Sequence, residues 1–485
     1  MKFFKEKLVI ILTISLFAVA TFFSIYKLYE SPPTWMDEGI IIQTARSIYD
    51  IGYPAIPVAP DKYESAGIVT TSYPVTIPVA MSFKLFGTGL IPARMVMVVY
   101  LLLLFIVSYI ILKKFVSPSR YLLSFALFIT FAPLYGQGKN VLGEVPGMFF
   151  FILFLSIIYF LELNVNKSKS IWLNLLAGLS GGLFVITKPI FILFIPAIFL
   201  AFIVKRFWFR NSSFVYFGKL QLFQFTIAFF LPIIVWFFFQ FTGDSIVSIF
   251  SLYANPYKVN VANVVFSNIR LLFSDFQPFY FLVLFIIWST SFIFRLWKKE
   301  NIYFAELISF FFSSLVFVAF FRTPGFYRYF FPAQVLAILY FIPSLELFIS
   351  KIKIFSNNKK SVFITLAVIA LVVLQSYVLV FTSWTAKSYD STRSKKMQES
   401  FSLISSKNIF LYQVPEVATF LPISSFYQFF YYAPGRSLGS KSLMALLNGL
   451  PDIVIVNSDV YKENKEMFYR YSKVDIVERY SILTK

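Results

Sequence analysis

Long apolar runs, separated by short polar segments, dominate the chain. Eleven of them approach the length of about 20 residues that a helix needs to cross a hydrocarbon core about 30 Å thick. They predict transmembrane helices at 8–28, 94–112, 121–137, 145–163, 171–188, 190–204, 217–240, 279–296, 303–321, 329–349 and 361–384. The pattern is typical of a polytopic α-helical membrane protein with about 11 transmembrane helices.

The polar segments between the runs indicate an orientation. Six of them are basic: "MKFFKEK", "KKFVSPSR", "NVNKSKS", "KRFWFRNSS", "RLWKKEN" and "KIKIFSNNKK". Cytoplasmic loops of membrane proteins are enriched in Lys and Arg, so we place these segments inside. Eleven spans then put the N-terminus in the cytoplasm and the C-terminus outside. We expect the protein in the cytoplasmic (inner) membrane, with an uncleaved first span that delivers the next segment outside.

Three segments predicted outside are long. The first, 29–93, contains "EGIIIQTARSIY", whose apolar residues recur at helical spacing. This pattern predicts an amphipathic helix on the membrane surface, with Thr34 and Asp37 as a capping box at its start. "YPVTIPVAMSFKLFG" predicts a second short, half-embedded helix, and the second outside segment, 241–278, reads as partly helical.

The third outside segment, 385–485, has the composition of a soluble domain. "NIFLYQ", "DIVIVN" and "VDIVERYSIL" in it read as short strands. "FLPISSFYQFFYYAPG" is too rich in Pro, Ser and Gln for a span, and its aromatic residues suit a surface that faces lipid headgroups. We expect two domains, a transmembrane domain over 1–384 and a small extracytoplasmic α/β domain over 385–485.

Composition narrows the chemistry. Only 14% of the 485 residues are charged, against about a quarter in soluble proteins. The net charge of +20 would suit a nucleic-acid-binding protein, but basic cytoplasmic loops explain it better. Cys and His are absent, which excludes disulfides, Cys or His zinc sites and Ser-His-Asp triads. A general base must be a carboxylate, Lys, Tyr or water, and a metal would need oxygen ligands.

Ionisable residues gather at the outside ends of the predicted spans. They are Asp37, Glu38, Arg94, Glu144, Lys188, Arg322 and Arg328. A cation at the end of a span commonly extends to the interface, which suffices to explain Arg94. It does not explain Lys188, which lies outside against the positive-inside tendency. A structural alternative for Glu144 is an ion pair with Lys139.

Acids and cations on one face suggest acid–base chemistry on a phosphate-containing substrate. Arg makes bidentate contacts with phosphate oxygens, and Lys supplies a point charge. Asp37 stands at a predicted helix start, where the helix dipole favours its ionised form and hence a general base. An aromatic-rich membrane groove beside these charges would suit a lipid tail. We therefore expect a lipid-phosphate-linked substrate cleaved at the outer surface, with cations stabilising the departing phosphate.

Two other functions remain open. One is a lipid-linked sugar transporter or flippase, and the other is a glycan polymerase or ligase with a pyrophosphate-linked donor. Transporters cluster charges near the bilayer midplane in broken helices. Here the charges are at span ends beside a long outside segment, which favours an enzyme.

The order of short motifs resembles the glycosyltransferase C superfamily, in particular its branch of protein O-mannosyltransferases and the lipid A aminoarabinose transferase. The motifs, within 1–345, are "TWMDEG", "YPVTIPVAMSFKLFGTGLIPAR", "LGEVPG", "GLSGGLFVITKP" and "FYRYFFPAQ". The resemblance implies an inverting transferase that moves a hexose or pentose from a polyprenyl-phosphate carrier to a lipid, glycan or protein acceptor. The implied site is on the extracytoplasmic face.

The resemblance also implies roles for individual residues. Asp37 would be the catalytic carboxylate, Glu38 its supporting neighbour and Glu144 a second acid. The carrier phosphate would be bound by Lys188, Arg322, Arg328 and Tyr329, with Arg94 and Tyr73 as further candidates. Structural alternatives are a helix-start carboxylate for Glu38 and an interfacial aromatic for Tyr329. No cofactor is required, and a divalent metal on Asp37, Glu38 and Glu144 stays open, although no spacing demands one.

Overall fold

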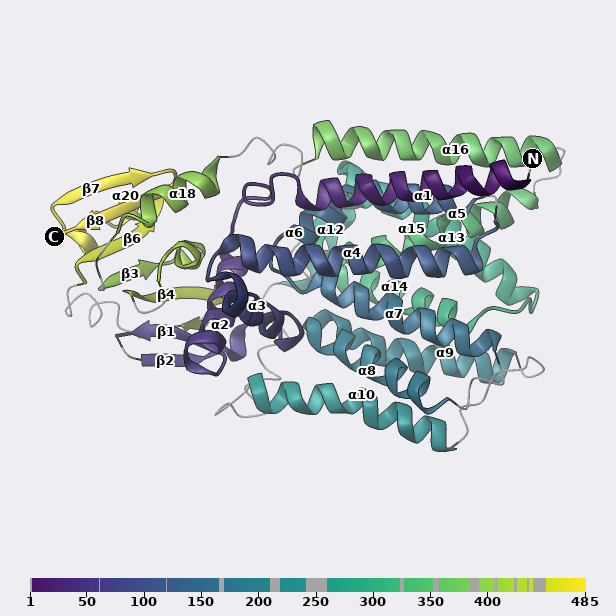
Figure 1. Ribbon diagram of the computed structural model, residues 1–485, viewed down its shortest axis with the longest axis horizontal. Helices are drawn as coiled ribbons and strands as arrows, with labels where there is room; N and C mark the ends of the chain where they lie inside the picture. Colours follow the sequence, from purple (N-terminus) through teal and green to yellow (C-terminus); the bar gives the residue numbers. More distant parts are fainter. Residues whose placement is uncertain are drawn as a thin grey trace.

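The apolar runs fold into helices that lie side by side along the long axis of the molecule (Figure 1). The computed structural model describes residues 2–485 apart from 61, 119, 165–169, 210–218, 241–259, 323–326, 352–356, 384–391, 405, 407, 423–424, 434–435 and 439–450. The long helices are α1 (Lys2–Ile25), α4 (Leu90–Phe115), α7 (Glu144–Leu163), α8 (Ile171–Thr187), α9 (Phe194–Trp208), α10 (Lys219–Gln240), α13 (Phe276–Trp297), α14 (Phe304–Phe320), α15 (Tyr327–Ser350) and α16 (Asn357–Tyr377). Shorter helical pieces among them are α5 (Tyr121–Ile129), α6 (Ala132–Lys139), η3 (Pro189–Leu193), α12 (Val261–Ser274) and η4 (Val378–Thr382).

Within the described residues, eight helical segments are long and apolar enough to cross a membrane. They are α1, α4, α7, η3 with α9, α10, α13, α15, and α16 with η4. The pair α5 and α6 is bent by 53°, at a break where Pro133 lies in the first turn of α6 and disfavours helix before it. The other two predicted spans are α8 and α14, of 17 residues each. The chain is therefore a multi-pass membrane protein, and the total of eleven spans stays a prediction.

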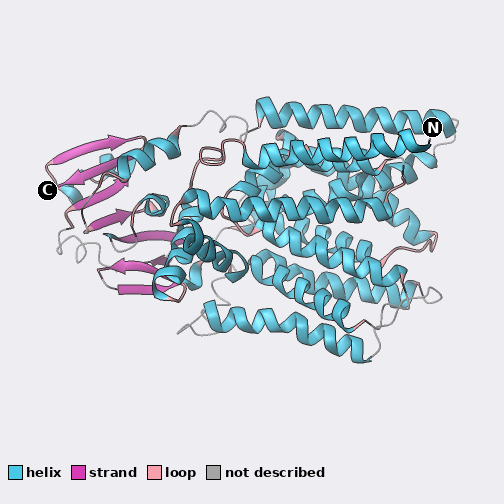
Figure 2. Cartoon of the chain, in the orientation of Figure 1, coloured by secondary structure: helices cyan, strands magenta, loops and turns pink. Residues whose placement is uncertain are grey.

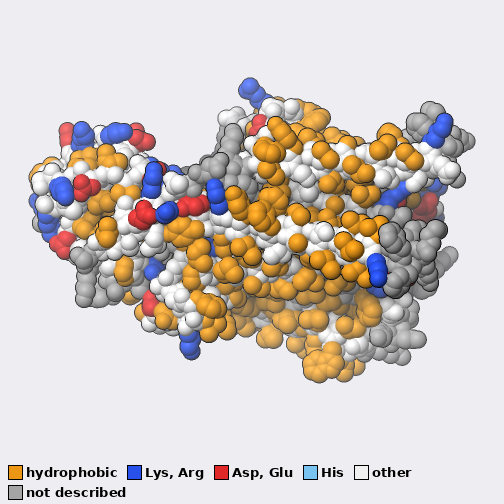
Figure 3. Space-filling model, turned by 45° about the horizontal axis from the view of Figure 1, so that its top comes forward, with side chains coloured by type: hydrophobic (Ala, Val, Ile, Leu, Met, Phe, Trp, Pro, Cys, Tyr) orange, Lys and Arg blue, Asp and Glu red, His pale blue; other side chains and the backbone are white. Residues whose placement is uncertain are grey.

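The outer faces of the helices carry large apolar side chains. Val99, Phe199 and Phe238 are examples of exposed hydrophobic residues on α4, α9 and α10, and such residues cover the helical body in Figure 3. Contiguous apolar surface of this extent suits lipid rather than water. The inward faces pack into one core that joins the long helices.

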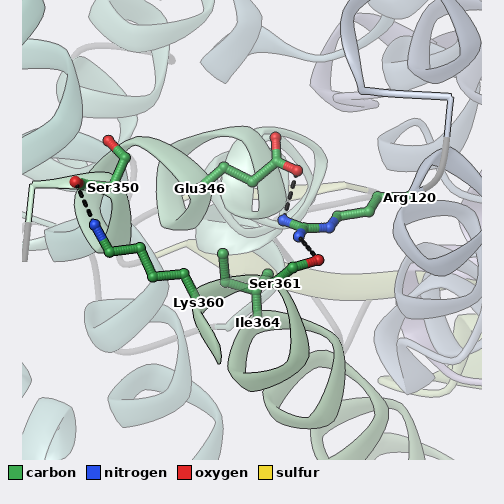
Figure 4. A pocket seen from close by; sticks show the side chains of 6 residues that line it. All are labelled: Arg120, Glu346, Ser350, Lys360, Ser361 and Ile364. Carbon is green, nitrogen blue, oxygen red and sulfur yellow. Dashed lines mark hydrogen bonds and ion pairs between the residues drawn. The ribbon is translucent and has the colours of Figure 1, made fainter. Parts of the chain in front are cut away.

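The described parts of the basic segments predicted to be cytoplasmic lie at the end of the molecule that holds the N-terminus (Figure 1). Three ion pairs tie helix ends together there: Lys205–Glu162 at 2.9 Å, Arg295–Glu306 at 2.7 Å and Arg120–Glu346 at 2.6 Å. Arg120 also donates to Ser361, and the two line a small pocket with Lys360 between α15 and α16 (Figure 4). These contacts anchor the end of the helical body that is distant from the C-terminal sheet.

At the opposite end, the first outside segment folds into α2 (Met36–Ile51), the hairpin β1 (Ala55–Ala59) and β2 (Lys62–Ser65), η1 (Ala66–Ile68) and α3 (Tyr73–Phe86). The prediction of a surface helix is wrong for α2, because every residue from Glu38 to Ser47 is buried. The capping box is also wrong. Trp35 is the N-cap without a side-chain hydrogen bond, and the Thr34 hydroxyl has no partner among the described residues.

The C-terminal part forms a six-stranded mixed sheet (Figure 2). Its elements are α18 (Arg393–Phe401), β3 (Ile409–Tyr412), η5 (Pro415–Phe420), β4 (Phe426–Ala433), β5 (Arg436–Leu438), β6 (Ile453–Asn457), α20 (Ser458–Glu463), η7 (Lys465–Phe468), β7 (Lys473–Val477) and β8 (Tyr480–Thr484). The strand order is β5-β4-β3-β6-β8-β7, with β4, β3 and β6 parallel and antiparallel pairs at both edges.

Two of the three stretches predicted as strands are confirmed as β3 and β6, whereas the third, "VDIVERYSIL", is divided between β7 and β8, which pair as a hairpin. The aromatic stretch expected to face lipid headgroups instead supplies β4, whose Phe426, Phe429 and Phe430 are buried. Aromatic side chains favour strands, which the Pro and Ser content had obscured. One face of the sheet shares a single core with α2, α3 and α4, so the first outside segment and the C-terminal sheet pack as one unit.

Candidate active site

Helix α2 presents two neighbouring acids to two different cations. Asp37 forms an ion pair with Arg328 from the first turn of α15, and the two side chains are 21% and 13% exposed. The Arg328 guanidinium lies 4.9 Å from the ring centroid of Trp35 and 5.1 Å from that of Tyr329, both favourable cation–π distances. It also donates to the Tyr329 hydroxyl at 3.3 Å. The Asp37–Arg328 pair is thus held between two aromatic rings while keeping some access.

Glu38 is fully buried and forms a bidentate pair with Arg94 of α4. Arg94 donates from Nε to Oε1 at 2.8 Å and from Nη2 to Oε2 at 2.7 Å, and both side chains are 0% exposed. Arg94 also donates to Asn140 Oδ1 at 3.0 Å and to the Leu28 carbonyl at 2.7 Å. The Val141 amide donates to Glu38 at 3.1 Å. A buried pair with this many hydrogen bonds ties α2 to α4 and to the start of α7.

Glu144, at the start of α7, lies beside Lys188, at the end of α8. Lys188 Nζ is 2.8 Å from Glu144 Oε1, without the angle of a hydrogen bond. The ion pair between Glu144 and Lys139 that the sequence left open is therefore wrong, since Lys139 donates to the Tyr26 carbonyl instead. Gly143 permits the close approach, because a Cβ there would lie 2.6 Å from the Thr187 carbonyl oxygen.

Both ion pairs involve ends of long helices, and we group their four residues as one cluster. This cluster consists of Asp37, Arg328, Glu144 and Lys188, and it carries two negative and two positive charges. Its four residues come from α2, α15, α7 and the end of α8. All four elements meet at the end of the helical body that faces the C-terminal sheet (Figure 1).

Two other predicted residues lie elsewhere. The Tyr73 hydroxyl, at the start of α3, donates to the Pro232 carbonyl of α10 at 3.3 Å, and burial raises the pKa of Tyr73 to about 12. Its neighbour Ser72 donates to the Ile186 carbonyl at 2.7 Å, two residues before Lys188. Arg322 follows α14, is exposed, and forms no ion pair within the described part of the chain.

Several buried polar atoms near the four-residue cluster have no hydrogen-bond partner among the described residues. They are Thr34 Oγ1, Trp35 Nε1 and both carboxylate oxygens of Glu144. A buried polar atom left unpaired costs about 1–3 kcal/mol; Glu144 keeps its ion pair with Lys188, so this cost falls on Thr34 and Trp35. Trp35 and Thr34 were missed from the sequence, although both stand in the motif "PPTWMDEG".

A shared metal site is a separate question. The described residues contain no group of three or more acids that could hold a metal ion. Asp37, Glu38 and Glu144 each face a cationic side chain of their own.

No family model matches the chain, and no curated protein sequence matches it. Solved structures do match. ArnT from Cupriavidus metallidurans bound to undecaprenyl phosphate superposes with a TM-score of 0.64 at 13% identity, over 98% of this chain and 97% of that chain. The Archaeoglobus fulgidus oligosaccharyltransferase in the apo form gives a TM-score of 0.55 at 11% identity, over 94% of this chain and 70% of the other.

The fold is shared with ArnT and with the Archaeoglobus fulgidus oligosaccharyltransferase. The resemblance inferred from the order of short motifs is thereby confirmed at the level of fold. A third structure, the archaeal oligosaccharyltransferase AglB from Archaeoglobus fulgidus in complex with an inhibitory peptide and a dolichol-phosphate, matches with a TM-score of 0.51 at 11% identity, over 94% of this chain and 70% of that chain. The ArnT match extends over nearly the whole of both chains, so it includes the C-terminal sheet as well as the helices.

Proposed function

We propose that the protein is a lipid-carrier-dependent, inverting glycosyltransferase that moves one sugar from a polyprenyl phosphate to an acceptor on the extracytoplasmic face. The observation that carries the proposal is the cluster of Asp37, Arg328, Glu144 and Lys188. It places a partly accessible carboxylate beside cations that suit a phosphate. The fold supports this function, since ArnT was solved with undecaprenyl phosphate and AglB with a dolichol-phosphate.

In the proposed reaction, the carboxylate of Asp37 takes the proton from an acceptor hydroxyl or amine. The acceptor atom then attacks the anomeric carbon of the sugar from the face opposite the phosphate. The bond between that carbon and the phosphate oxygen breaks, and the electron pair leaves with the phosphate. Arg328 and Lys188 stabilise the charge that develops on this oxygen.

Binding of the carrier changes the pairing within the cluster. While Arg328 is paired with Asp37, each partner neutralises the other. A carrier phosphate would attract Arg328, helped by Tyr329, and so release the Asp37 carboxylate to act as a base. In the same way, the carrier phosphate would attract Lys188 away from Glu144, because the contact between Lys188 and Glu144 lacks hydrogen-bond geometry.

The other candidate residues take different roles in this proposal. The hydrogen bonds of Arg94 to Glu38, Asn140 and a backbone carbonyl support a positioning role for both partners of the buried pair. Arg322 is exposed beyond α14, where it could attract the anionic carrier towards the cluster. In this proposal the sugar donor would enter between α3 and α10. Tyr73 would line that path, since its hydroxyl donates to the Pro232 carbonyl there.

The test uses purified protein in vesicles with a panel of undecaprenyl-phosphate sugars. Release of undecaprenyl phosphate together with a glycosylated acceptor is the expected result. Asp37→Asn should abolish turnover while undecaprenyl phosphate still binds, and Arg328→Gln should weaken that binding. Translocation of the donor without bond cleavage would instead support a flippase. Turnover only with pyrophosphate-linked donors would support a polymerase or ligase, and normal turnover by Asp37→Asn would remove Asp37 from the mechanism.

A further inference from the structure

One face of α2 is covered by the C-terminal part of the chain. Successive residues of an α-helix turn by about 100°, so Gly39, Gln43 and Arg46 share a face that lies about 180–240° around the helix from Asp37. All three contact η5 or the residues that flank it. Asp37 therefore faces α15 from one side of α2, while η5 and its flanking residues pack against the other side.

The first contact depends on the absence of a side chain. A Cβ on Gly39 would lie 2.5 Å from the Cα of Glu416 and 2.6 Å from the carbonyl oxygen of Pro415. Both are backbone atoms, so no change of rotamer could relieve the clash. Glycine thus allows η5 to touch α2 two residues after Asp37.

Polar contacts fix the rest of the interface. Gln43 donates to the Pro415 carbonyl at 2.8 Å and exchanges side-chain amide hydrogen bonds with Gln428 of β4. Arg46 is 5% exposed and donates to the carbonyls of Ala418 at 2.9 Å and Leu421 at 2.5 Å. Two polar side chains on one helix face, Gln43 and Arg46, thus donate to backbone carbonyls of the same partner segment, which favours a single register between α2 and η5.

Burial makes this interface costly to open. Burial lowers the pKa of the Arg46 guanidinium to about 10, and nearby Asp50 opposes the shift. The apolar residues around Arg46, among them Ile42, Val417 and Ala418, belong to one continuous core. A guanidinium buried in such a core needs its carbonyl partners. If α2 separated from η5, the charge of Arg46 and the carbonyl groups would lose these hydrogen bonds, and water would have to replace them.

We infer that η5 and β4 form a positioning element of the active site, which holds α2 so that Asp37 faces Arg328, and that Gly39 and Arg46 are positioning residues. This inference rests on the proposed function, because it assigns the C-terminal part a role in the same reaction. The Glu38–Arg94 pair fixes α2 towards α4, and η5 fixes it from the other side. The carrier-binding cations on α8 and α15 do not depend on this contact.

The inference predicts a loss of turnover without a loss of carrier binding. Arg46→Met should lower kcat at least tenfold, whereas KM for the undecaprenyl-phosphate sugar and the dissociation constant of undecaprenyl phosphate should change less than twofold. Arg46→Lys keeps a donor for the two carbonyls and should recover part of kcat. Gly39→Ala, which introduces the backbone clash, should act like Arg46→Met. Tyr49→Ala, at an exposed position of the same helix, is the matched control and should leave both quantities unchanged.

Three results separate the possible failures. A wild-type kcat in Arg46→Met and Gly39→Ala would overturn the positioning role while leaving the proposed function intact. An equal loss of turnover and of undecaprenyl phosphate binding would overturn it as well, because that result describes general destabilisation. Absence of turnover by the wild-type protein with every undecaprenyl-phosphate sugar would contradict the proposed function itself.

Discussion

Asp37 and Glu38 are adjacent in the chain, yet a turn of about 100° around α2 gives them different surroundings. Asp37 keeps some exposure beside Arg328, whereas Glu38 is enclosed with Arg94. A base must reach its substrate, so only Asp37 has the access that catalysis needs. The sequence pointed to the pair and to the difference in role, but the partner of Glu38 could not be read from it. Arg94 lies 56 positions away, and side-chain pairing at that separation depends on packing.

The buried pair leads to a prediction on stability. Glu38→Gln should reduce stability by about 3–5 kcal/mol, because it leaves the Arg94 charge buried without a counter-ion. Thermal unfolding of the detergent-solubilised protein would measure the change. Glu38→Gln combined with Arg94→Met removes the stranded charge and should recover part of the loss. A single variant as stable as the wild type would show that Arg94 finds another counter-ion.

Tyr480 in the C-terminal sheet gives a pH-dependent prediction. Its hydroxyl donates to Glu416 at 2.7 Å, and burial together with Glu416 raises its pKa to about 12. The folded state holds the phenol proton more tightly than the unfolded state, where the pKa is about 10. The stabilisation is therefore complete below pH 10 and is lost as the pH rises towards 12. Unfolding of the wild type and Tyr480→Phe, compared between pH 8 and 12, should show the difference between them shrinking at high pH.

At the scale of elements, the close packing of α8 against α10 helps to place the end of α8 at the candidate active site. Gly178 and Gly182 are four residues apart on α8, and Cβ atoms there would lie 2.3 Å from the carbonyl oxygens of Phe225 and Phe229. Small residues at this spacing allow close packing of membrane helices. The glycines thus bring α10 against α8, whose following residue is Lys188.

Replacement of one of these glycines should therefore affect both packing and the site. Gly182→Val should destabilise the protein by about 1–3 kcal/mol, since overpacking forces the helices apart. Undecaprenyl phosphate binding should weaken as well, because Lys188 moves with α8. Gly181→Ala is the matched control, as a Cβ there would meet only side-chain atoms of Phe194 and Phe229 at 3.2–3.3 Å. Equal effects of the two variants would contradict this account of the packing.

Elements with a strong periodic or continuous apolar pattern were predicted correctly from the sequence. The eight long apolar helices among the described residues and the strands β3 and β6 belong to this group. The sequence was misleading for α2 and β4, because the burial of both depends on a contact between segments far apart in the chain. The apolar face of α2 fits a membrane surface as well as it fits a protein core, and only the tertiary structure distinguishes the two.

At the scale of the whole molecule, two chemically different ends enclose the apolar body. The end with the N-terminus holds the described basic residues and their ion pairs, and the C-terminal sheet forms the other end (Figure 1). From the positive-inside rule we expect the cluster on the outside. The sequence supported this orientation through its loops, whereas the packing of the C-terminal sheet on α2 had no signal in local composition.

The orientation can be measured directly, because the chain has no cysteine. Single substitutions Tyr469→Cys, near the sheet, and Lys298→Cys, among the basic segments, are both at exposed positions. A membrane-impermeant maleimide should label Tyr469→Cys in intact cells and Lys298→Cys only after permeabilisation. The reverse pattern would invert the topology, and labelling of both in intact cells would mean that the two ends share one side.

The contacts of α2 have a consequence for synthesis. Asp37 leaves the ribosome early, its partner Arg328 follows 291 residues later, and the partners of Gln43 and Arg46 follow after 372 residues. During most of translation the docking face of α2 lacks its cover. A chain that ended before β4 could insert most of its helices, but α2, which carries Asp37, would lack the contacts with the C-terminal sheet. Under the proposed function, the support of α2 is complete only after η5 and β4 have been synthesised, so we expect shorter chains in the membrane to lack turnover.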